Sequence, residues 1–286
     1  MTGASGHLGR AVAKHAAAAL GTGRHLVLAT RTPAAFTGAQ PETDVRRADF
    51  TDPTTLADAF VGVDRAVIIS TDDIDGRARG QIAAIEAARA AGVRHILYTS
   101  MLAPVPANPA IIAPSHWATE EHLRNSGTDY TILRAGFYAD FQVFEAAAAL
   151  ASGTLVHNRG DGRCAYLARD DIARAAAAVL VGGGHEGETL DLTGTEAFDA
   201  PALARLYSEI GGHEVTPQVV SDDAMLGLLG AGSEGHNQYG ARLTVSIGQA
   251  IRGGFCDLVT DTVAQLTGRA PDPLGAVLAR SGGSPG

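Results

Sequence analysis

Cysteine, lysine and long apolar runs are all scarce in this chain of 286 residues. The two cysteines, Cys164 and Cys256, stand far apart in the sequence, so we expect neither a disulfide framework nor a thiolate metal site. Apolar stretches such as residues 146–151 fall far short of the roughly 20 residues that a membrane-spanning helix needs. No basic and then apolar segment opens the chain. We therefore expect no signal peptide, no membrane segment and a cytoplasmic location.

Basic side chains are also scarce: the chain has 22 of them and 31 acidic side chains, which gives a formal net charge of -9. Such a field repels nucleic-acid backbones and anionic lipid, so we expect neither as a partner. The ten histidines are scattered without the paired spacing that places two on one helical face, which predicts no metal site. The partner that we expect is therefore a small molecule. The sequence does not decide whether the protein forms a homodimer.

Short β-branched runs alternate with alanine-rich helical stretches up to about residue 135. This alternation predicts a Rossmann-type α/β fold, a doubly wound parallel sheet with helices on both faces. The expected strands are residues 26–30, 44–48, 66–70, 95–99 and 130–133. The expected helices are residues 8–20, 53–60, 77–91 and 114–125.

The pattern loosens beyond Gly136 and predicts a smaller α+β portion on the substrate side. We expect helices at 141–151, 170–181 and 201–210 and strands at 188–192 and 214–220. The predicted domains are a dinucleotide-binding domain over residues 1–140, completed by parts of 151–195, and a substrate-side portion over 196–279. Residues 280–286 have no core-forming side chain and are expected to form a disordered tail.

A glycine-rich turn stands at the very start, with Gly3, Gly6 and Gly9 at a spacing of three residues. In dinucleotide-binding folds such glycines let the backbone turn tightly and approach the pyrophosphate at a helix N-terminus. A loop that uses glycine only for its backbone freedom is the alternative. The turn predicts dinucleotide binding because it precedes several alternating units. Only Met1 and Thr2 precede it where a central strand is expected, and we therefore expect a clipped start.

Cofactor choice in such folds is decided just after the second strand, where a carboxylate suits NAD and an arginine suits the 2′-phosphate of NADP. Here that strand runs into Arg31, without a carboxylate. NADP(H) is therefore the expected cofactor, with Arg31 on its 2′-phosphate. Asp49, after the third strand, holds the adenine edge or caps the helix that begins at Pro53, and the sequence does not decide between them.

The proton relay of the main short-chain dehydrogenases, a tyrosine four residues before a lysine, is missing. The only lysine is Lys14, which has no tyrosine at that spacing. Hydride transfer without this relay suits quinones, because their reduced oxygens resemble a phenol with a pKa of about 10 and water can complete the protonation. An isolated ketone would give a far more basic alkoxide. We therefore expect an electron-poor, conjugated acceptor.

Several motifs together resemble the NmrA-like, atypical branch of the short-chain dehydrogenases, and within it the bacterial NAD(P)H-dependent quinone oxidoreductases. The likeness covers roughly the first 195 residues. It is carried by residues 2–9 (TGASGHLG), 48–52 (ADFTD), 68–71 (IIST), 90–100 (AAGVRHILYTS), 116–120 (HWATE), 130–138 (YTILRAGFY), 160–162 (GDG), 168–171 (ARDD), 185–188 (HEGE) and 192–194 (LTG).

The resemblance implies a set of cofactor contacts. Those on the pyrophosphate would be Gly3, Ala4, Ser5, Gly6, His7 and Leu8. Arg31 would meet the 2′-phosphate, and Ser70, Thr71 and Asp72 would line the ribose and nicotinamide. The later contacts would be Gly136, Phe137 and Tyr138, near the reactive ring, and Arg169, from a later loop.

Two positions depart from the resembled family. Glu121 stands where relatives carry lysine, and Ala135 stands where they carry asparagine. The resemblance implies that both changes fall near the nicotinamide pocket. They favour the alternative function, an NmrA-like regulator that senses NADP(H) without turnover. The closer likeness to quinone oxidoreductases favours an enzyme that reduces quinones, azo dyes or triphenylmethane dyes.

Two side chains are candidates for catalysis. Tyr138 donates to or stacks on a reduced acceptor, or else packs in the core with a satisfied hydroxyl. His116 protonates an acceptor oxygen, or else is a structural histidine that bonds backbone at a helix start, which is the reading we favour.

Overall fold

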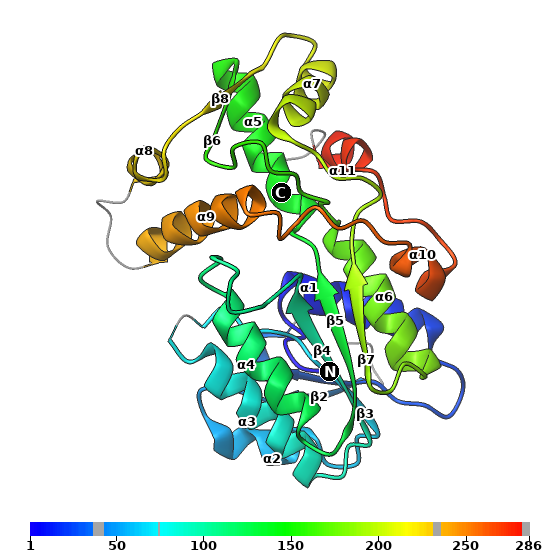
Figure 1. The fold of residues 1–286 in the computed structure, drawn as a ribbon. Helices are drawn as coiled ribbons and strands as arrows, with labels where there is room; N and C mark the ends of the chain where they lie inside the picture. The colour runs from blue at the N-terminus through cyan, green and yellow to red at the C-terminus, as the bar shows by residue number, and fades with distance from the viewer. Residues whose placement is uncertain (37–42, 74, 231–235, 282–286) are drawn as a thin grey trace.

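Parallel strands with helices on both faces form the larger, lower portion of the molecule in Figure 1. The computed structural model describes residues 1–36, 43–73, 75–230 and 236–281. The strands β3, β4, β5 and β7 lie side by side in that order, and β1 pairs with β2 in a separate ladder. These strands are β1 (Val27–Thr30), β2 (Asp44–Arg47), β3 (Arg65–Ile68), β4 (His95–Met101), β5 (Asp129–Ala135) and β7 (Glu188–Leu192).

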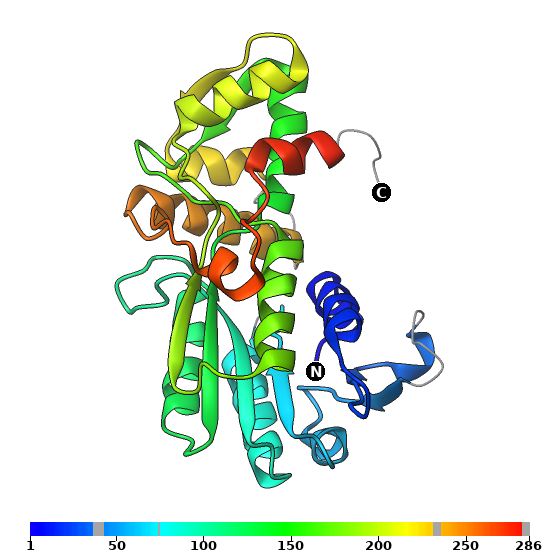
Figure 2. The same ribbon diagram turned by 90° about the vertical axis from the view of Figure 1, so that its right-hand side faces the viewer.

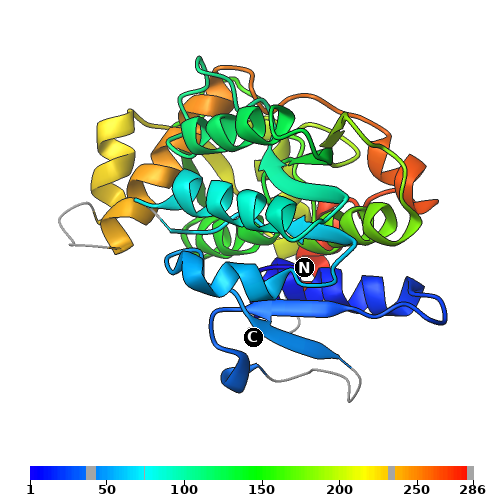
Figure 3. The same ribbon diagram turned by 90° about the horizontal axis from the view of Figure 1, so that it is seen from below.

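Met1 and Thr2 join the two ladders. The amide of Thr2 donates to the Val67 carbonyl of β3 at 2.9 Å, and the amide of Ala29 in β1 donates to the Met1 carbonyl at 2.8 Å. With this two-residue segment in the first-strand position, the strand order is that of a doubly wound dinucleotide fold. The predicted fold class is therefore confirmed. Figure 3 shows β1 and β2 beside the main sheet, with the amino terminus between them.

Two layers of helices cover the sheet because its strands are apolar on both faces. On one face α1 (His7–Ala19) and α6 (Arg169–Gly182) pack against Val67, Leu97 and Leu133. On the other face α2 (Leu56–Ala59) and α3 (Arg77–Ala90) pack against Ile68, Ile96 and Ile132, and α4 (Ala113–Arg124) adds Leu123 to the same cluster. Figure 2 shows α1 and α6 stacked on one side of the sheet.

A smaller portion sits at the carboxyl ends of the strands, above the sheet in Figure 1. Its core joins a helix that follows β5 to helices near the end of the chain. Its elements are α5 (Gln142–Ser152), β6 (Thr154–His157), α7 (Ala200–Gly211), β8 (Thr216–Val219), α8 (Asp222–Leu228), α9 (His236–Arg252) and α11 (Leu274–Ser281). Helix α10 (Thr262–Thr267) instead returns to the lower portion, where Val263 joins the cluster of α1 and α6.

Most expected elements are present within one or two residues of the expected bounds. The sequence did not predict β6 or the helices α8 to α11. The expected helix 53–60 begins as a 3-10 turn over Pro53–Thr55, and another 3-10 turn, Ala139–Phe141, precedes α5. Of the predicted tail, Arg280 and Ser281 end α11, whereas 282–286 lie outside the described residues. In the part of the chain that the structure describes, no helix has the length and apolar character needed to span a membrane.

Candidate functional site

The glycine turn forms a cradle of bare backbone at the N-terminus of α1. Gly3 has φ +64°, which favours glycine, and a Cβ placed on Gly9 would lie 2.0 Å from the Gly3 carbonyl oxygen. The side chain of Ser5, within the turn, accepts a hydrogen bond of 2.9 Å from the Thr30 hydroxyl at the end of β1. The turn therefore holds helix and strand together and leaves the first amides of α1 available for an anion.

Arg31 follows β1 directly and is exposed beside this turn. Its charge reaches Asp49, whose pKa is lowered chiefly by hydrogen bonds from Thr51, with Arg31 and Arg47 contributing. The N-cap of the 3-10 turn that begins at Pro53 is Asp52, whose carboxylate accepts from the Thr54 amide. The alternative that Asp49 caps this helix is therefore wrong. Asp49 instead accepts from the Thr51 amide at 3.0 Å and its hydroxyl at 2.7 Å.

Side chains of two other elements hold the segment after β3. The Ser70 amide donates to Thr99 Oγ1 at 2.9 Å, and the Thr71 amide donates to Gln81 Oε1 at 3.1 Å. Asp72 is exposed just beyond them. The three residues predicted to line the ribose and nicotinamide therefore lie at the carboxyl end of a parallel strand, where ligands bind in this architecture.

The segment after β5 passes close to a neighbouring loop. A Cβ on Gly136 would lie 2.8 Å from the Ala165 carbonyl oxygen, so this position has no room for a side chain. Phe137 is half-buried, and its carbonyl accepts from the Leu167 amide at 3.0 Å. Tyr138 then stacks on Phe141, with ring centroids 6.0 Å apart and planes 9° from parallel.

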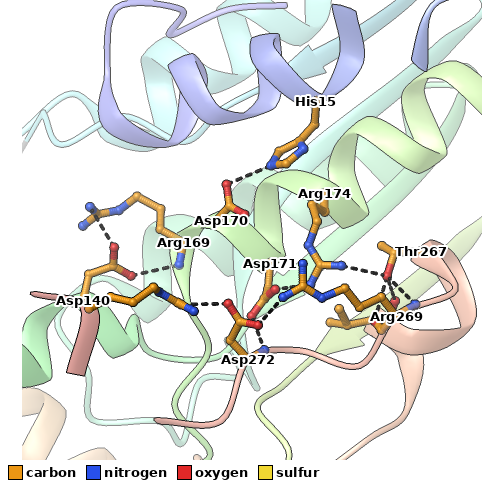
Figure 4. A network of polar contacts seen from close by, with 11 residues as sticks. His15, Asp140, Arg169, Asp170, Asp171, Arg174, Thr267, Arg269 and Asp272 are labelled. Atoms are coloured by element: carbon orange, nitrogen blue, oxygen red, sulfur yellow. Dashed lines mark hydrogen bonds and ion pairs between the residues drawn. The ribbon is translucent and has the colours of Figure 1, made fainter. Parts of the chain in front are cut away.

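Arg169 covers these two rings from the first position of α6. Its guanidinium carbon lies 5.0 Å from the Tyr138 ring centroid and 5.6 Å from that of Phe141. The Asp140 carboxylate receives the Arg169 amide at 2.8 Å and pairs with its guanidinium at 3.5 Å, as Figure 4 shows. Burial raises the pKa of the Tyr138 phenol against the opposing charge of Arg169. Tyr138 therefore stays protonated at neutral pH.

His116 lies buried in α4 within a chain of side-chain hydrogen bonds. The carbonyl oxygen of the Gln81 side chain accepts from the Thr71 amide. The Nε2 of Gln81 therefore donates, to the Tyr98 hydroxyl at 2.9 Å and to Thr119 Oγ1 at 2.8 Å. The Tyr98 proton is then left for Nδ1 of His116, 2.8 Å away. Burial, with the charge of Arg77, lowers the pKa of His116 to about 3.

This network assigns His116 as a neutral imidazole with its proton on Nε2. The ring bonds the Tyr98 side chain and not backbone, which differs from the structural alternative considered from the sequence. It also ties the candidate catalytic residue to Thr71, since Gln81 contacts both Tyr98 and the Thr71 amide. Gln81 was not among the residues predicted from the sequence. Its only signal was a polar side chain inside an alanine-rich helix.

Only one of the two departures from the resembled family lies at this end of the sheet. Ala135 ends β5. Glu121 is turned away, because α4 runs back toward the amino ends of the strands. Its carboxylate pairs with Arg124 at 2.7 Å, and Arg124 in turn reaches Thr189 near the start of β7. Glu121 therefore lies nearer the amino ends of the strands than His116 does, and its effect on the nicotinamide pocket stays a prediction.

The described residues contain no group of three or more His, Cys, Asp or Glu side chains that could hold a metal ion. The structure instead brings together a glycine turn at a helix N-terminus, an arginine beside it and polar residues at the ends of two strands. These are the parts of a dinucleotide site.

Comparison with known proteins supports this assignment. Quinone oxidoreductase 2 of Escherichia coli is 37% identical over 223 residues, which cover 78% of this chain and 77% of that protein. The crystal structure of the NADPH-dependent quinone oxidoreductase QOR2 from the same species, complexed with NADPH, has a TM-score of 0.89 and 31% identity and covers 98% of each chain. The triphenylmethane reductase of Citrobacter sp., complexed with NADP(H), has a TM-score of 0.89 and 32% identity over 98% of each chain.

A family described as NAD(P)H-binding matches residues 3–181, from the glycine turn to the end of α6. The resemblance to NmrA-like reductases is thus confirmed on sequence and structure. Because the match spans more than half of the chain and begins at the phosphate cradle, this protein belongs to the NAD(P)H-binding family.

Proposed function

We propose that this protein is an NADPH-dependent reductase that transfers hydride to quinones or to similar conjugated acceptors such as azo or triphenylmethane dyes. The observation that carries the proposal is the glycine cradle with Arg31 beside it, in a fold that matches a quinone oxidoreductase crystallised with NADPH. The shared fold and cradle also support NADPH as the cofactor.

The residues present fit a dinucleotide. The turn from Gly3 to Leu8 would hold the pyrophosphate, because the first amides of α1 have no side-chain cap and Gly9, with no room for a Cβ, lets the helix pack closely on Gly3. Arg31 would hold the 2′-phosphate, and Ser70, Thr71 and Asp72 the ribose and nicotinamide. The residues on the other side of the nicotinamide would be Gly136, Phe137, Tyr138 and Arg169. When bound, NADPH supplies a hydride.

The residues around the acceptor act without a tyrosine–lysine relay, since Lys14 lies in α1. Tyr138 would stack on a planar acceptor, and the neutral His116 would offer the Nε2 proton as a hydrogen-bond donor. Neither residue has to give up a proton, because a reduced quinone oxygen has the acidity of a phenol, about 10, and water protonates it.

Steady-state oxidation of NADPH with a panel of benzoquinones, azo dyes and triphenylmethane dyes tests the proposal. We expect turnover with at least one class and a lower KM for NADPH than for NADH. Calorimetric binding of NADPH is measured in parallel. Micromolar NADPH binding without turnover on any acceptor would reject the reductase and leave the alternative, a sensor of NADP(H).

Of the two departures from the resembled family, Ala135 ends β5 at the carboxyl ends of the strands, whereas Glu121 lies in the second half of α4 and pairs with Arg124. We therefore expect Ala135 to bear more on the acceptor than Glu121 does.

A further inference from the structure

A buried serine without a partner lies at the carboxyl end of β4. Ser100 is 6% exposed, and its Oγ has no hydrogen-bond partner. It stands two residues after Tyr98, so both side chains point to the face of the sheet that α3 and α4 cover. A buried hydroxyl without a partner costs about 1–3 kcal/mol, which makes it a candidate for a ligand contact.

The neighbour of Ser100 in the next strand does not satisfy it. Ser100 is in register with Arg134 of β5, but the Arg134 guanidinium is taken by the fully buried Glu120, at 3.0 Å from Nε and 2.7 Å from Nη2. The Ser100 hydroxyl is therefore left without a protein partner. His116, on the same side of the sheet, also has a free donor, because its Nε2 has no partner among the described residues.

Arg77 is a cation without an ion-pair partner among the described residues, and it lies on the same side of the sheet as Ser100 and His116. Arg77 is the first residue of α3 and lies four positions before Gln81, so both occupy one face of the helix. Gln81 reaches the Tyr98 hydroxyl, and Arg77 lies one turn closer to the carboxyl ends of the strands. The charge of Arg77 favours a lower pKa at Tyr98, His116 and Tyr138, in each case as a smaller contribution than burial. In the described parts of the chain Arg77 has neither an ion pair nor a hydrogen bond.

We propose that Arg77, Ser100 and His116 form the binding site for the acceptor oxygen on which negative charge develops. The ligand class is a quinone carbonyl that becomes a phenolate, and this inference rests on the proposed function. Arg77 supplies the positive charge that no lysine provides here. The hydroxyl of Ser100 and the Nε2 proton of His116 supply two neutral donors, which do not need to dissociate.

The balance of the step is simple. The quinone gains a hydride, that is two electrons and one proton, from the reduced dinucleotide of the proposed function, and becomes a hydroquinone monoanion. The three side chains hold that oxyanion by charge and hydrogen bonds while it forms. A proton from water then converts it to the hydroquinone. No side chain of the site is oxidised or permanently deprotonated.

Binding of a stable phenolate tests the site without turnover. The protein saturated with NADP⁺ is titrated with 2,4-dinitrophenolate and, separately, with its neutral methyl ether, and affinity and the phenolate absorption band are recorded. We expect the wild-type protein to bind the phenolate at least tenfold more tightly than the ether, and its absorption band to shift on binding.

The decisive variant is Arg77→Gln, with Arg79→Gln as the matched control. Arg79 is exposed on the same first turn of α3 and faces another direction. Arg77→Gln should abolish the preference for the phenolate while ether and NADP⁺ affinities stay within twofold, and Arg79→Gln should change none of them. Ser100→Ala should reduce the preference at least threefold and reduce the band shift.

Three results would overturn the site. The first is a wild-type protein that binds phenolate and ether equally. The second is an Arg77→Gln protein that keeps the preference. The third is an Arg77→Gln protein in which NADP⁺ affinity falls as much as phenolate affinity, because Arg77 would then serve the cofactor. A failure of the reductase assay is separate, since the phenolate titration needs no turnover.

Discussion

The carboxylate of Asp140, in the 3-10 turn before α5, accepts a hydrogen bond of 2.8 Å from the backbone amide of Arg169. Asp140 thereby caps α6, whose own N-cap residue, Ala168, has no side chain for that purpose. The other oxygen of the same carboxylate pairs at 3.5 Å with the Arg169 guanidinium, which lies over Tyr138 at the edge of the proposed nicotinamide site. Figure 4 shows that the neighbouring acids of α6 are used differently: Asp170 meets His15 of α1, and Asp171 meets Arg174.

Replacing Asp140 should therefore affect stability and binding together. Asp140→Ala should lower the free energy of unfolding by about 1 kcal/mol, the usual value of a lost cap, and should weaken NADPH binding severalfold because Arg169 is released. Asp140→Asn keeps an acceptor for the amide and should recover most of the stability. Urea denaturation and calorimetric titration measure the two effects. Asp170→Ala, which removes an exposed pair only, is the control, and an equal response of the two alanine variants would contradict this role.

The glycine cradle predicts a sharp difference between two glycines of the same region. Gly9→Ala places a Cβ 2.0 Å from the Gly3 carbonyl oxygen, whereas Gly21 has no heavy atom within 4 Å of the same position. Gly9→Ala should therefore cost about 1–3 kcal/mol of stability and weaken NADPH binding more than tenfold. Gly21→Ala should change neither. Thermal melting with and without NADPH measures both, and unchanged NADPH stabilisation in a folded Gly9→Ala protein would count against the cradle.

Much of the fold followed from the sequence because its signals are local. The alternation of β-branched runs and alanine-rich stretches predicted the strands and helices from α1 to β8 apart from β6, and the spacing of Gly3, Gly6 and Gly9 predicted the cradle. β6 was missed because it is only four residues long and is paired through β8, a strand of equally weak pattern. Helices α8 to α11 were missed for a related reason. Their burial depends on partners far along the chain.

The site was less predictable, because helix direction and long-range contacts decide it. The motif alone does not tell how far Glu121 lies from the nicotinamide, because that depends on α4, which runs from the carboxyl ends toward the amino ends of the strands. Arg77, Gln81 and Ser100 belong to no motif that specifies their role. Their importance follows from which polar groups are satisfied in the folded chain and which are not.

Arg31 should control the choice of cofactor. Arg31→Asp removes the cation proposed for the 2′-phosphate and places a carboxylate where NAD-specific proteins have one. A charge-assisted contact contributes about 1.5–3 kcal/mol, so NADPH affinity should fall about tenfold to hundredfold and the preference should shift to NADH. Titration with both cofactors measures it. Arg47→Asp, at the exposed end of β2, is the control for charge alone. Equal losses of NADPH affinity in both variants would show a general field effect.

The two cysteines, distant in sequence, are neighbours in space. The Ala165 amide, next to Cys164, donates to the Cys256 carbonyl at 2.9 Å, and both side chains are buried in one cluster. Burial, with the adjacent Cys256 thiol, raises the pKa of Cys164 well above its usual range. An aromatic disulfide reagent should therefore leave the native protein unmodified and label both thiols after denaturation. Ala17→Cys, on the exposed side of α1, should add one thiol that reacts at once. Rapid labelling of the native wild type would show that this core opens.

His116 should make the stability of the protein depend on pH. In the folded chain burial, with the charge of Arg77, lowers its pKa to about 3, whereas in the unfolded chain the imidazole titrates near its ordinary value of about 6.5. Between these values the unfolded state binds more protons. The stabilisation is therefore complete above pH 6.5 and is lost as the pH falls toward 3, by at most about 1.4 kcal/mol per pH unit.

We accordingly expect the wild type to lose about 2 kcal/mol between pH 7 and pH 5 through this group. His95 and His157 are also buried with lowered pKa, so the contribution of His116 has to be isolated by difference. His116→Gln cannot titrate and should be less stable than wild type at pH 7, because it loses the ring packed on Tyr98. Its deficit should shrink as the pH falls to 5. Urea denaturation at both pH values measures this deficit. Parallel losses in the two proteins would mean that the folded His116 accepts a proton, and then its Nε2–H could not be the neutral donor that the acceptor site requires.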